Sequence, residues 1–210
     1  MPPRLPMSIV SPASAWTSEE QYRIGLSNAI ALNQVSAHAK YAEWVTNFAK
    51  NLPRMWKDKE VADLPKAHGA GLVIGAGPSI DKYGHLDLLT KSNFRGPIFC
   101  ADRVLANAQR KGVHVNYSLN VDSSDRCLDF LTNADTTIPL IVAGTVNPKF
   151  VEAWKGEVYW FVPDIGLCGQ HQFSVADTLS MISGKTIISS GGNVGTTSVL
   201  AAHIVGAKPI

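Results

Sequence analysis

Two glycines one residue apart follow a short apolar run, and residues 71–81 read GLVIGAGPSID. Glycine lets a backbone come close to a ligand, and the free N–H groups at the start of a helix attract an anion. Proline suits the first turn of such a helix. We therefore predict that Gly75, Gly77, Pro78 and Ser79 bind a phosphate group. The alternative is a tight strand-to-helix turn that holds no ligand.

This loop differs from two common phosphate-binding motifs. Ile80 and Asp81 stand where G-x-G-x-x-G would place its third glycine, and no clear acidic residue follows about 20 residues later to bind a ribose. The loop also lacks the Gly-Lys-Ser/Thr ending of a P-loop. A dinucleotide-dependent dehydrogenase and a P-loop ATPase are therefore disfavoured.

A second glycine-rich segment, SSGGNVGTT over residues 189–197, lies between an apolar run and a helical pattern. Backbone N–H groups and hydroxyls at such a helix start could hold a further phosphate. The predicted contacts are Ser190, Gly191, Gly192 and Asn193. Glycines at helix starts also serve packing alone, so that interpretation stays open.

Carboxylates end two successive apolar runs, at Asp102 and at Asp122. In an open parallel sheet the carboxyl ends of the strands face the ligand crevice. Mg²⁺ prefers one or two carboxylates, completed by water and phosphate oxygens. We predict that both aspartates are catalytic residues and that Asp122 is the Mg²⁺ ligand; the alternative is that they cap helices.

The elements that must position these residues alternate along the chain from residue 72. Short apolar runs predict strands, and segments of about ten residues between them predict helices, which is typical of a Rossmann-like three-layer α/β fold with a mostly parallel sheet. The predicted strands are residues 72–74, 97–101, 117–121, 138–143, 158–162 and 186–189. The predicted helices are residues 80–90, 104–111, 124–132, 148–154, 174–182 and 194–205.

The sequence divides into a helical N-terminal extension, residues 1–65, and the Rossmann-like domain, residues 66–210. Ser18 and its neighbouring carboxylates predict a helix start near residue 18. Lys208-Pro209-Ile210 comes where a further strand is expected to begin, so the domain is predicted to be truncated at this end.

The composition excludes several other classes. There are 19 Lys and Arg against 17 Asp and Glu, without a basic cluster, so no nucleic-acid partner is predicted. No apolar stretch is long enough to span a bilayer, and the three cysteines lack the spacing of a zinc or redox site. We predict a cytoplasmic protein with reduced thiols and a small-molecule substrate.

The order and spacing of GAGPS at 75–79, Ala101-Asp102, Asn120-Val121-Asp122 and SGGNV at 190–194 define a resemblance. Over residues 70–210 the chain resembles the 6-hydroxymethylpterin diphosphokinase MptE-like family, which includes motility accessory factor proteins linked to flagellin glycosylation. Members typically continue into a strand that ends in Gly-x-Asp. Residues 101–123 are also similar to thiamine pyrophosphokinases, with Arg103 in place of a glycine and Asn120 in place of an acidic residue.

The resemblance implies a Mg²⁺-dependent transfer of diphosphate from ATP, the co-substrate, to 6-hydroxymethyl-dihydropterin or a similar hydroxymethyl acceptor. It also leaves two alternatives: a glycosyltransferase that uses a nucleotide-activated nonulosonic sugar, and a nucleotide-binding module without catalysis. The substrate is accordingly a nucleotide, a pterin or an activated sugar. A homo-oligomer is compatible with the sequence.

Overall fold

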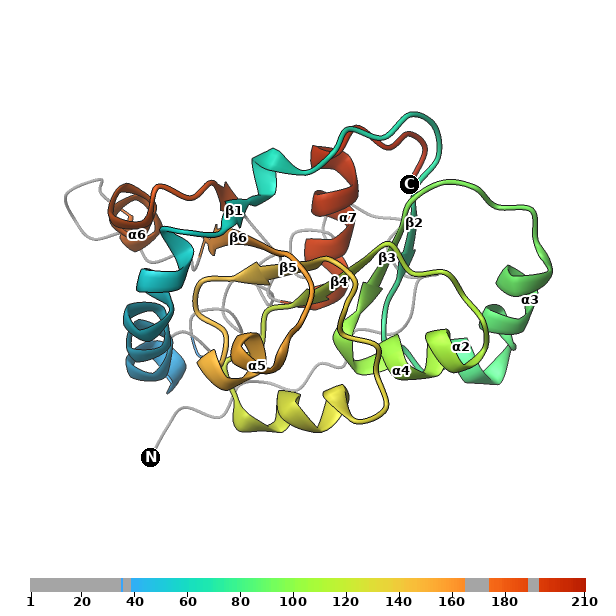
Figure 1. Cartoon of the computed structure of the whole chain (residues 1–210), viewed down its shortest axis with the longest axis horizontal. Coiled ribbons are helices and arrows are strands. Elements are labelled where there is room, and N and C mark those ends of the chain that lie inside the picture. The colour runs from blue at the N-terminus through green and yellow to red at the C-terminus, as the bar shows by residue number, and fades with distance from the viewer. Residues whose placement is uncertain (1–34, 36–38, 165–173, 189–192) are drawn as a thin grey trace, which may run out of the picture. The chain divides into compact units, whose positions relative to one another are not determined.

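The computed structural model of the chain describes residues 35, 39–164, 174–188 and 193–210 (Figure 1). Internal contacts divide the chain into two units, Met1–Ala39 and Lys40–Ile210. The second unit contains the sheet and every predicted site residue that the structure describes. Its described helices include none that is long and apolar enough to cross a membrane.

The sheet of the second unit has seven strands. Six of them lie in the order β1-β6-β5-β4-β3-β2, and the seventh, β7, pairs with β6. All the pairings are parallel. The strands are β1 (Lys59–Glu60), β2 (Leu72–Ile74), β3 (Ile98–Ala101), β4 (Tyr117–Asn120), β5 (Leu140–Ala143), β6 (Val158–Pro163) and β7 (Ile187–Ile188).

Helices connect these strands. They are η2 (Val61–Asp63), α2 (Ser79–Lys82), α3 (His85–Lys91), α4 (Asp102–Arg110), η3 (Asp125–Leu131), α5 (Pro148–Ala153), α6 (Val175–Ser183) and α7 (Val194–Ile204), of which η2 and η3 are 3-10 helices. Strands β2 to β6 follow one another in space as in sequence. Right-handed crossovers therefore place α4, η3 and α5 on one face, and α7 contacts β2, β3 and β4 from the other (Figure 1).

Burial explains why the strands read as nearly continuous apolar runs. All residues of β3, β5 and β6 are buried, because helices cover both faces of a parallel sheet. Trp160 of β6 and Phe99 of β3 are among the largest fully buried side chains that the structure describes. The Trp160 indole donates a hydrogen bond to Asp58 Oδ2 at 3.0 Å, which satisfies its buried N–H group.

The α/β prediction is confirmed, and each predicted strand lies within two residues of its observed bounds. The predicted helix over residues 80–90 is divided into α2 and α3, because Gly84 adopts a left-handed conformation with φ of 61°. The predicted helix over residues 124–132 is the 3-10 helix η3, Asp125–Leu131, instead of an α-helix. Residues 40–65 were assigned to the extension, yet they lie in the same unit as the sheet, and β1 pairs with β6.

Candidate ligand-binding site at the carboxyl edge of the sheet

The loops that leave β2, β3 and β4 lie side by side, because these strands are neighbours in a parallel sheet. The glycine loop, residues 75–79, follows β2, Asp102 follows β3, and Asp122 lies just beyond the end of β4. The structure thus brings these predicted site residues to the edge where parallel sheets bind ligands.

Packing within the protein does not account for the two glycines of the glycine loop. Among the described residues, a Cβ atom at Gly75 would have no neighbour within 4 Å, and one at Gly77 would meet Ser79 Oγ at 3.8 Å. At Gly144, by contrast, a Cβ atom would lie 2.9 Å from Met55 Cε. The backbone at 75 and 77 is therefore open to a close approach from outside, as a phosphate requires.

The helix that begins at the glycine loop is shorter than expected. Pro78 is the N-cap residue with φ of −65° and ψ of −15°, and α2 extends over only four residues, from Ser79 to Lys82. A single turn has a small dipole. Phosphate binding at this loop would therefore depend on individual backbone N–H groups more than on a long helix.

Asp102 is the first residue of α4, and its side chain is almost completely buried, with 6% exposed. Its Oδ2 atom accepts a hydrogen bond from Asn120 Nδ2 at 2.7 Å. Burial, with a smaller contribution from the nearby charge of Asp122, raises the pKa of Asp102 to about 7. Asp102 can therefore exchange a proton near neutral pH.

Asn120, the last residue of β4, links the two aspartates. Its amide donates to Asp102, and its Oδ1 atom accepts the backbone N–H of Asp122 at 2.7 Å. The side chain is fully buried, so both hydrogen bonds are protected from water. No role for Asn120 was predicted from the sequence. Its position as a polar residue at the end of an apolar strand is the feature that could have indicated one.

The Asp122 side chain is partly exposed, with 44% of its surface accessible. Its Oδ1 atom accepts the backbone N–H of Ser124 at 3.0 Å and lies 3.6 Å from Lys40 Nζ. Within the described part of the chain, Oδ2 has no hydrogen bond. Asp122 therefore stabilises the local turn with one oxygen, and its other oxygen has no hydrogen bond to a described residue.

The crossing helix, residues 40–55 within the second unit, lies over the ends of β4 and β5. Asn47 Nδ2 donates to the carbonyls of Ser123 and Thr145, at 3.1 and 3.3 Å. Asn51 Nδ2 donates to the carbonyls of Gly144 and Val146, at 3.0 and 2.9 Å. These buried hydrogen bonds satisfy loop carbonyls that would otherwise need water. They attach the crossing helix firmly to the loops that follow β4 and β5.

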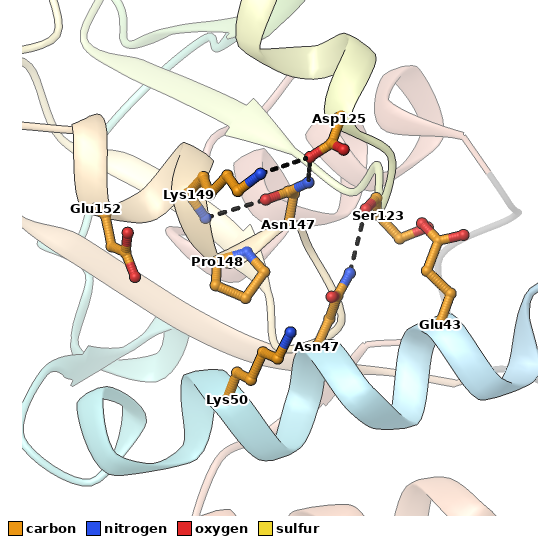
Figure 2. A pocket seen from close by; sticks show the side chains of 9 residues that line it. All are labelled: Glu43, Asn47, Lys50, Ser123, Asp125, Asn147, Pro148, Lys149 and Glu152. Atoms are coloured by element: carbon orange, nitrogen blue, oxygen red, sulfur yellow. Dashed lines mark hydrogen bonds and ion pairs between the residues drawn. The ribbon is translucent and has the colours of Figure 1, made fainter.

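A polar depression of about 490 Å³ lies between the crossing helix and the loops after β4 and β5 (Figure 2). It is lined by Glu43, Asn47, Lys50, Ser123, Asp125, Asn147, Pro148, Lys149 and Glu152. Asn147 is fixed there by its hydrogen bond to Asp125 at 2.8 Å, and Lys149 lies 3.6 Å from the same carboxylate. Its lining suits a ligand rich in hydroxyls or amides more than a flat apolar ring.

A second depression, of about 470 Å³, borders the glycine loop. It is lined mainly by apolar residues. The lining residues are Leu72, Val73, Ile74, Gly75, Gly77, Ser79, Ile80, His85, Leu86 and Leu89. Apolar walls with a few polar groups are typical of sites for small planar molecules.

The predicted second phosphate segment is described only in part. Ser190, Gly191 and Gly192 lie outside the described residues. Asn193 is the N-cap of α7, and its Oδ1 atom accepts the N–H of Thr196 at 3.0 Å. Its side chain is therefore committed to the helix start, which favours a capping role.

The side chains near Asp122 fit a Mg²⁺ ion only if substrate oxygens complete its coordination. No group of three or more His, Cys, Asp or Glu among the described residues could hold a metal. Asp102 and Asp122 are close enough for their charges to interact, and one oxygen of Asp122 is unpartnered in the described structure. One or two carboxylates plus phosphate oxygens and water is the usual set for Mg²⁺.

The described cysteines are not placed for catalysis. Cys100 and Cys127 are buried free thiols, and burial raises the pKa of each to about 12. Both therefore stay protonated at neutral pH.

A parallel sheet covered on both faces, with a glycine loop and the buried carboxyl of Asp102 at its carboxyl edge, defines a Rossmann-like α/β protein. The chain belongs to the family described as 6-hydroxymethylpterin diphosphokinase MptE-like, whose model matches residues 46–210. The resemblance read from the loop motifs is thereby confirmed. Family membership supports a transferase-like role.

A similar fold occurs in the solved structure of a MAf glycosyltransferase from Magnetospirillum magneticum AMB-1. The TM-score is 0.50 at 16% identity, over 69% of this chain and 22% of the other. The chain therefore spans about a fifth of that protein's length, and the likeness concerns the fold alone. No curated protein matches the sequence.

Proposed function

We propose that the chain is a Mg²⁺-dependent diphosphokinase that transfers diphosphate from ATP to the hydroxymethyl group of a dihydropterin or a similar acceptor. One observation carries the proposal. The open glycine loop lies two strands from Asp122, and the intervening strand ends at the buried carboxyl of Asp102. Phosphate-binding backbone and hard oxygen ligands thus lie along one edge, which suits phosphoryl-type transfer.

In the proposed reaction the acceptor oxygen attacks the β-phosphorus of ATP. A new O–P bond forms, the bond from the β-phosphorus to the bridging oxygen of the α-phosphate breaks, and AMP leaves with that oxygen. The acceptor's proton must be removed. Asp102 is suited to take it, because burial raises its pKa to about 7 and its carboxyl is held by Asn120.

The glycine loop would hold the phosphate chain, and Asp122 would hold Mg²⁺ through Oδ2. When bound, the metal would neutralise charge on the phosphate oxygens. Ser190, Gly191 and Gly192, which lie outside the described residues, keep their proposed role as further phosphate contacts. Asn193 would support them by fixing the start of α7.

The apolar depression beside the glycine loop suits the ring of the nucleotide or of the pterin. Two of its lining residues, Leu86 and Ile74, are buried, and Gly75 and Gly77 of the glycine loop also line it. A planar ring there would stand next to phosphates at Gly75 and Gly77. This arrangement supports a substrate that combines a flat ring with a phosphate chain.

A second candidate function is glycosyl transfer from a nucleotide-activated sugar. The polar depression favours it, because carboxylates, lysines and asparagine amides offer many hydrogen bonds to hydroxyl groups (Figure 2). The two functions share the phosphate loop and differ in the acceptor.

Calorimetry and thermal shift distinguish these functions. The purified protein would be titrated with ATP, CMP, CMP-sialic acid and 6-hydroxymethyl-dihydropterin, each with and without Mg²⁺. A ligand that binds only the folded state raises its apparent stability. Stabilisation by Mg²⁺-ATP and the pterin, followed by AMP release when both are present, is the expected result.

Stabilisation by the cytidine ligands alone would move the assignment to glycosyl transfer. ATP binding without turnover in any combination would indicate a nucleotide-binding module. A protein that responds to no ligand of this panel would contradict both transferase assignments for this chain.

A further inference from the structure

The crossing helix brings a basic side chain to the proposed metal site. Lys40 Nζ lies 3.6 Å from Asp122 Oδ1 and donates to Ser123 Oγ at 3.5 Å. Lys40 is far from these residues in sequence, and the loop motifs gave no indication of it. Among the described residues, no other basic side chain lies within ion-pair distance of Asp102 or Asp122.

The position of Lys40 is set by the rest of the crossing helix. Asn47 lies two turns further on, so both residues face the same side of the helix. The Asn47 amide binds the carbonyl of Ser123, the residue whose hydroxyl accepts from Lys40. Asn51, one turn beyond, binds two more loop carbonyls. The helix therefore cannot shift without breaking buried hydrogen bonds.

The ammonium group itself remains free to change partner. The side chains of Lys40 and Asp122 are 41% and 44% exposed, and their separation is long for a strong ion pair. Lys40 approaches Oδ1, the oxygen that already accepts the Ser124 N–H group. Asp122 Oδ2, which has no hydrogen bond to a described residue, is left for a metal ion.

The other basic residue next to the aspartates is turned away. Arg103 follows Asp102 directly, yet its guanidinium lies over the ring of Phe130, 5.8 Å from the ring centre. That contact favours a structural role for Arg103. Lys40 is then the described cation beside Asp122 that could meet a phosphate bound there.

We propose that Lys40 is an anion-binding residue of this site, which neutralises Asp122 when no ligand is bound and pairs with a phosphate oxygen when Mg²⁺ and a phosphorylated ligand bind. The inference rests on the proposed function. The positive charge of Lys40 should therefore weaken the binding of Mg²⁺ alone and strengthen the binding of a phosphate chain. The ammonium repels Mg²⁺ that binds alone, because both are cations beside one carboxylate, and it attracts a phosphate chain.

The test compares Lys40→Gln, Lys40→Arg and Lys111→Gln by calorimetry, with Mg²⁺ alone and with inorganic tripolyphosphate at saturating Mg²⁺. Lys111 is a matched control, because it also forms a partly exposed ion pair with an aspartate, Asp87, at the opposite end of α4 from Asp102. Thermal unfolding of each variant checks that the fold is retained.

We expect Lys40→Gln to bind Mg²⁺ alone about twofold to fivefold more tightly and tripolyphosphate about fivefold to tenfold more weakly. Lys40→Arg should retain both wild-type affinities within about twofold, since it keeps the charge. Lys111→Gln should change neither.

Equal affinities in Lys40→Gln and Lys111→Gln would overturn the inference. So would a parallel loss of both affinities in Lys40→Gln, because that pattern indicates a displaced helix. Wild-type protein that binds neither probe would refute the proposed function together with this inference, whereas the first two outcomes refute the inference alone.

Discussion

Asn120 Nδ2 lies 2.7 Å from Asp102 Oδ2, and both side chains are buried at the carboxyl ends of adjacent strands. The other end of the same amide accepts the backbone N–H of Asp122. One asparagine therefore sets the position of one site carboxylate and of the turn that carries the other. The positions of the two carboxylates are therefore coupled through Asn120. A substitution at Asp102, Asn120 or Asp122 should alter the position of the other two residues.

Asn120→Ala should destabilise the fold, because it removes a buried hydrogen bond to the Asp102 carboxyl and leaves the Asp122 N–H group without its side-chain partner. The expected loss in the free energy of unfolding is about 2 to 4 kcal/mol, measured by urea denaturation. Ser118→Ala is the control in the same strand. Ser118 Oγ is the buried side-chain polar atom without a hydrogen bond in the described structure, so its removal should be neutral or stabilising. Equal losses in the two variants would refute the linking role of Asn120.

Asp102→Asn should change how stability depends on pH. The folded-state pKa of Asp102 is raised from 3.8 to about 7, so its charged form opposes folding. The penalty is absent below about pH 4, grows as pH rises and is complete above about pH 7. The stability of Asp102→Asn relative to wild type should therefore increase by about 1 to 4 kcal/mol between pH 4 and pH 8. Urea denaturation across this range would detect it, and two parallel pH profiles would count against a raised pKa.

Asp122→Asn should abolish the Mg²⁺-dependent response and leave the fold intact. The asparagine carbonyl can still accept the Ser124 N–H group, so the free energy of unfolding should change by less than about 1 kcal/mol. Mg²⁺-dependent stabilisation should disappear in calorimetry, and turnover should fall about a hundredfold or more. Asp87→Asn, which removes an exposed carboxylate paired with Lys111, should behave as wild type. Unchanged Mg²⁺ binding in Asp122→Asn would remove this residue from the site.

Gly75→Ala and Gly77→Val should weaken nucleotide binding without unfolding the protein. The protein leaves space at both positions, so stability should be nearly unchanged, but the added atoms occupy the space predicted for phosphate. Affinity for Mg²⁺-ATP is expected to fall about tenfold or more, measured by calorimetry. Gly144→Ala should show the reverse pattern, because its Cβ atom would press on Met55 and Phe48 of the crossing helix. If the loop variants bind ATP normally, the glycine loop is a structural turn.

Local patterns were sufficient to predict most of the fold. Apolar runs such as the one at 140–143 mark strands that are buried on both faces, and glycine or proline marks their ends, so element type could be predicted without tertiary information. The division of the helix at Gly84 and the pairing of Lys59–Glu60 with β6 were missed. A strand of two residues, such as Lys59–Glu60, is too short to show a periodic pattern. Its pairing also depends on β6, which is distant in sequence.

By itself the sequence determined the parallel α/β architecture, the glycine loop and the placement of Asp102 and Asp122 after successive strands. These features follow from short-range rules of backbone conformation and from continuous apolar runs. Only the tertiary structure decided that Asn120 joins the two aspartates, that Asp102 is buried enough to raise its pKa, and that Lys40 reaches Asp122. Burial and charge pairing depend on which distant segments meet. Here the crossing helix meets the loops of the sheet, a contact between residues that no local pattern connects.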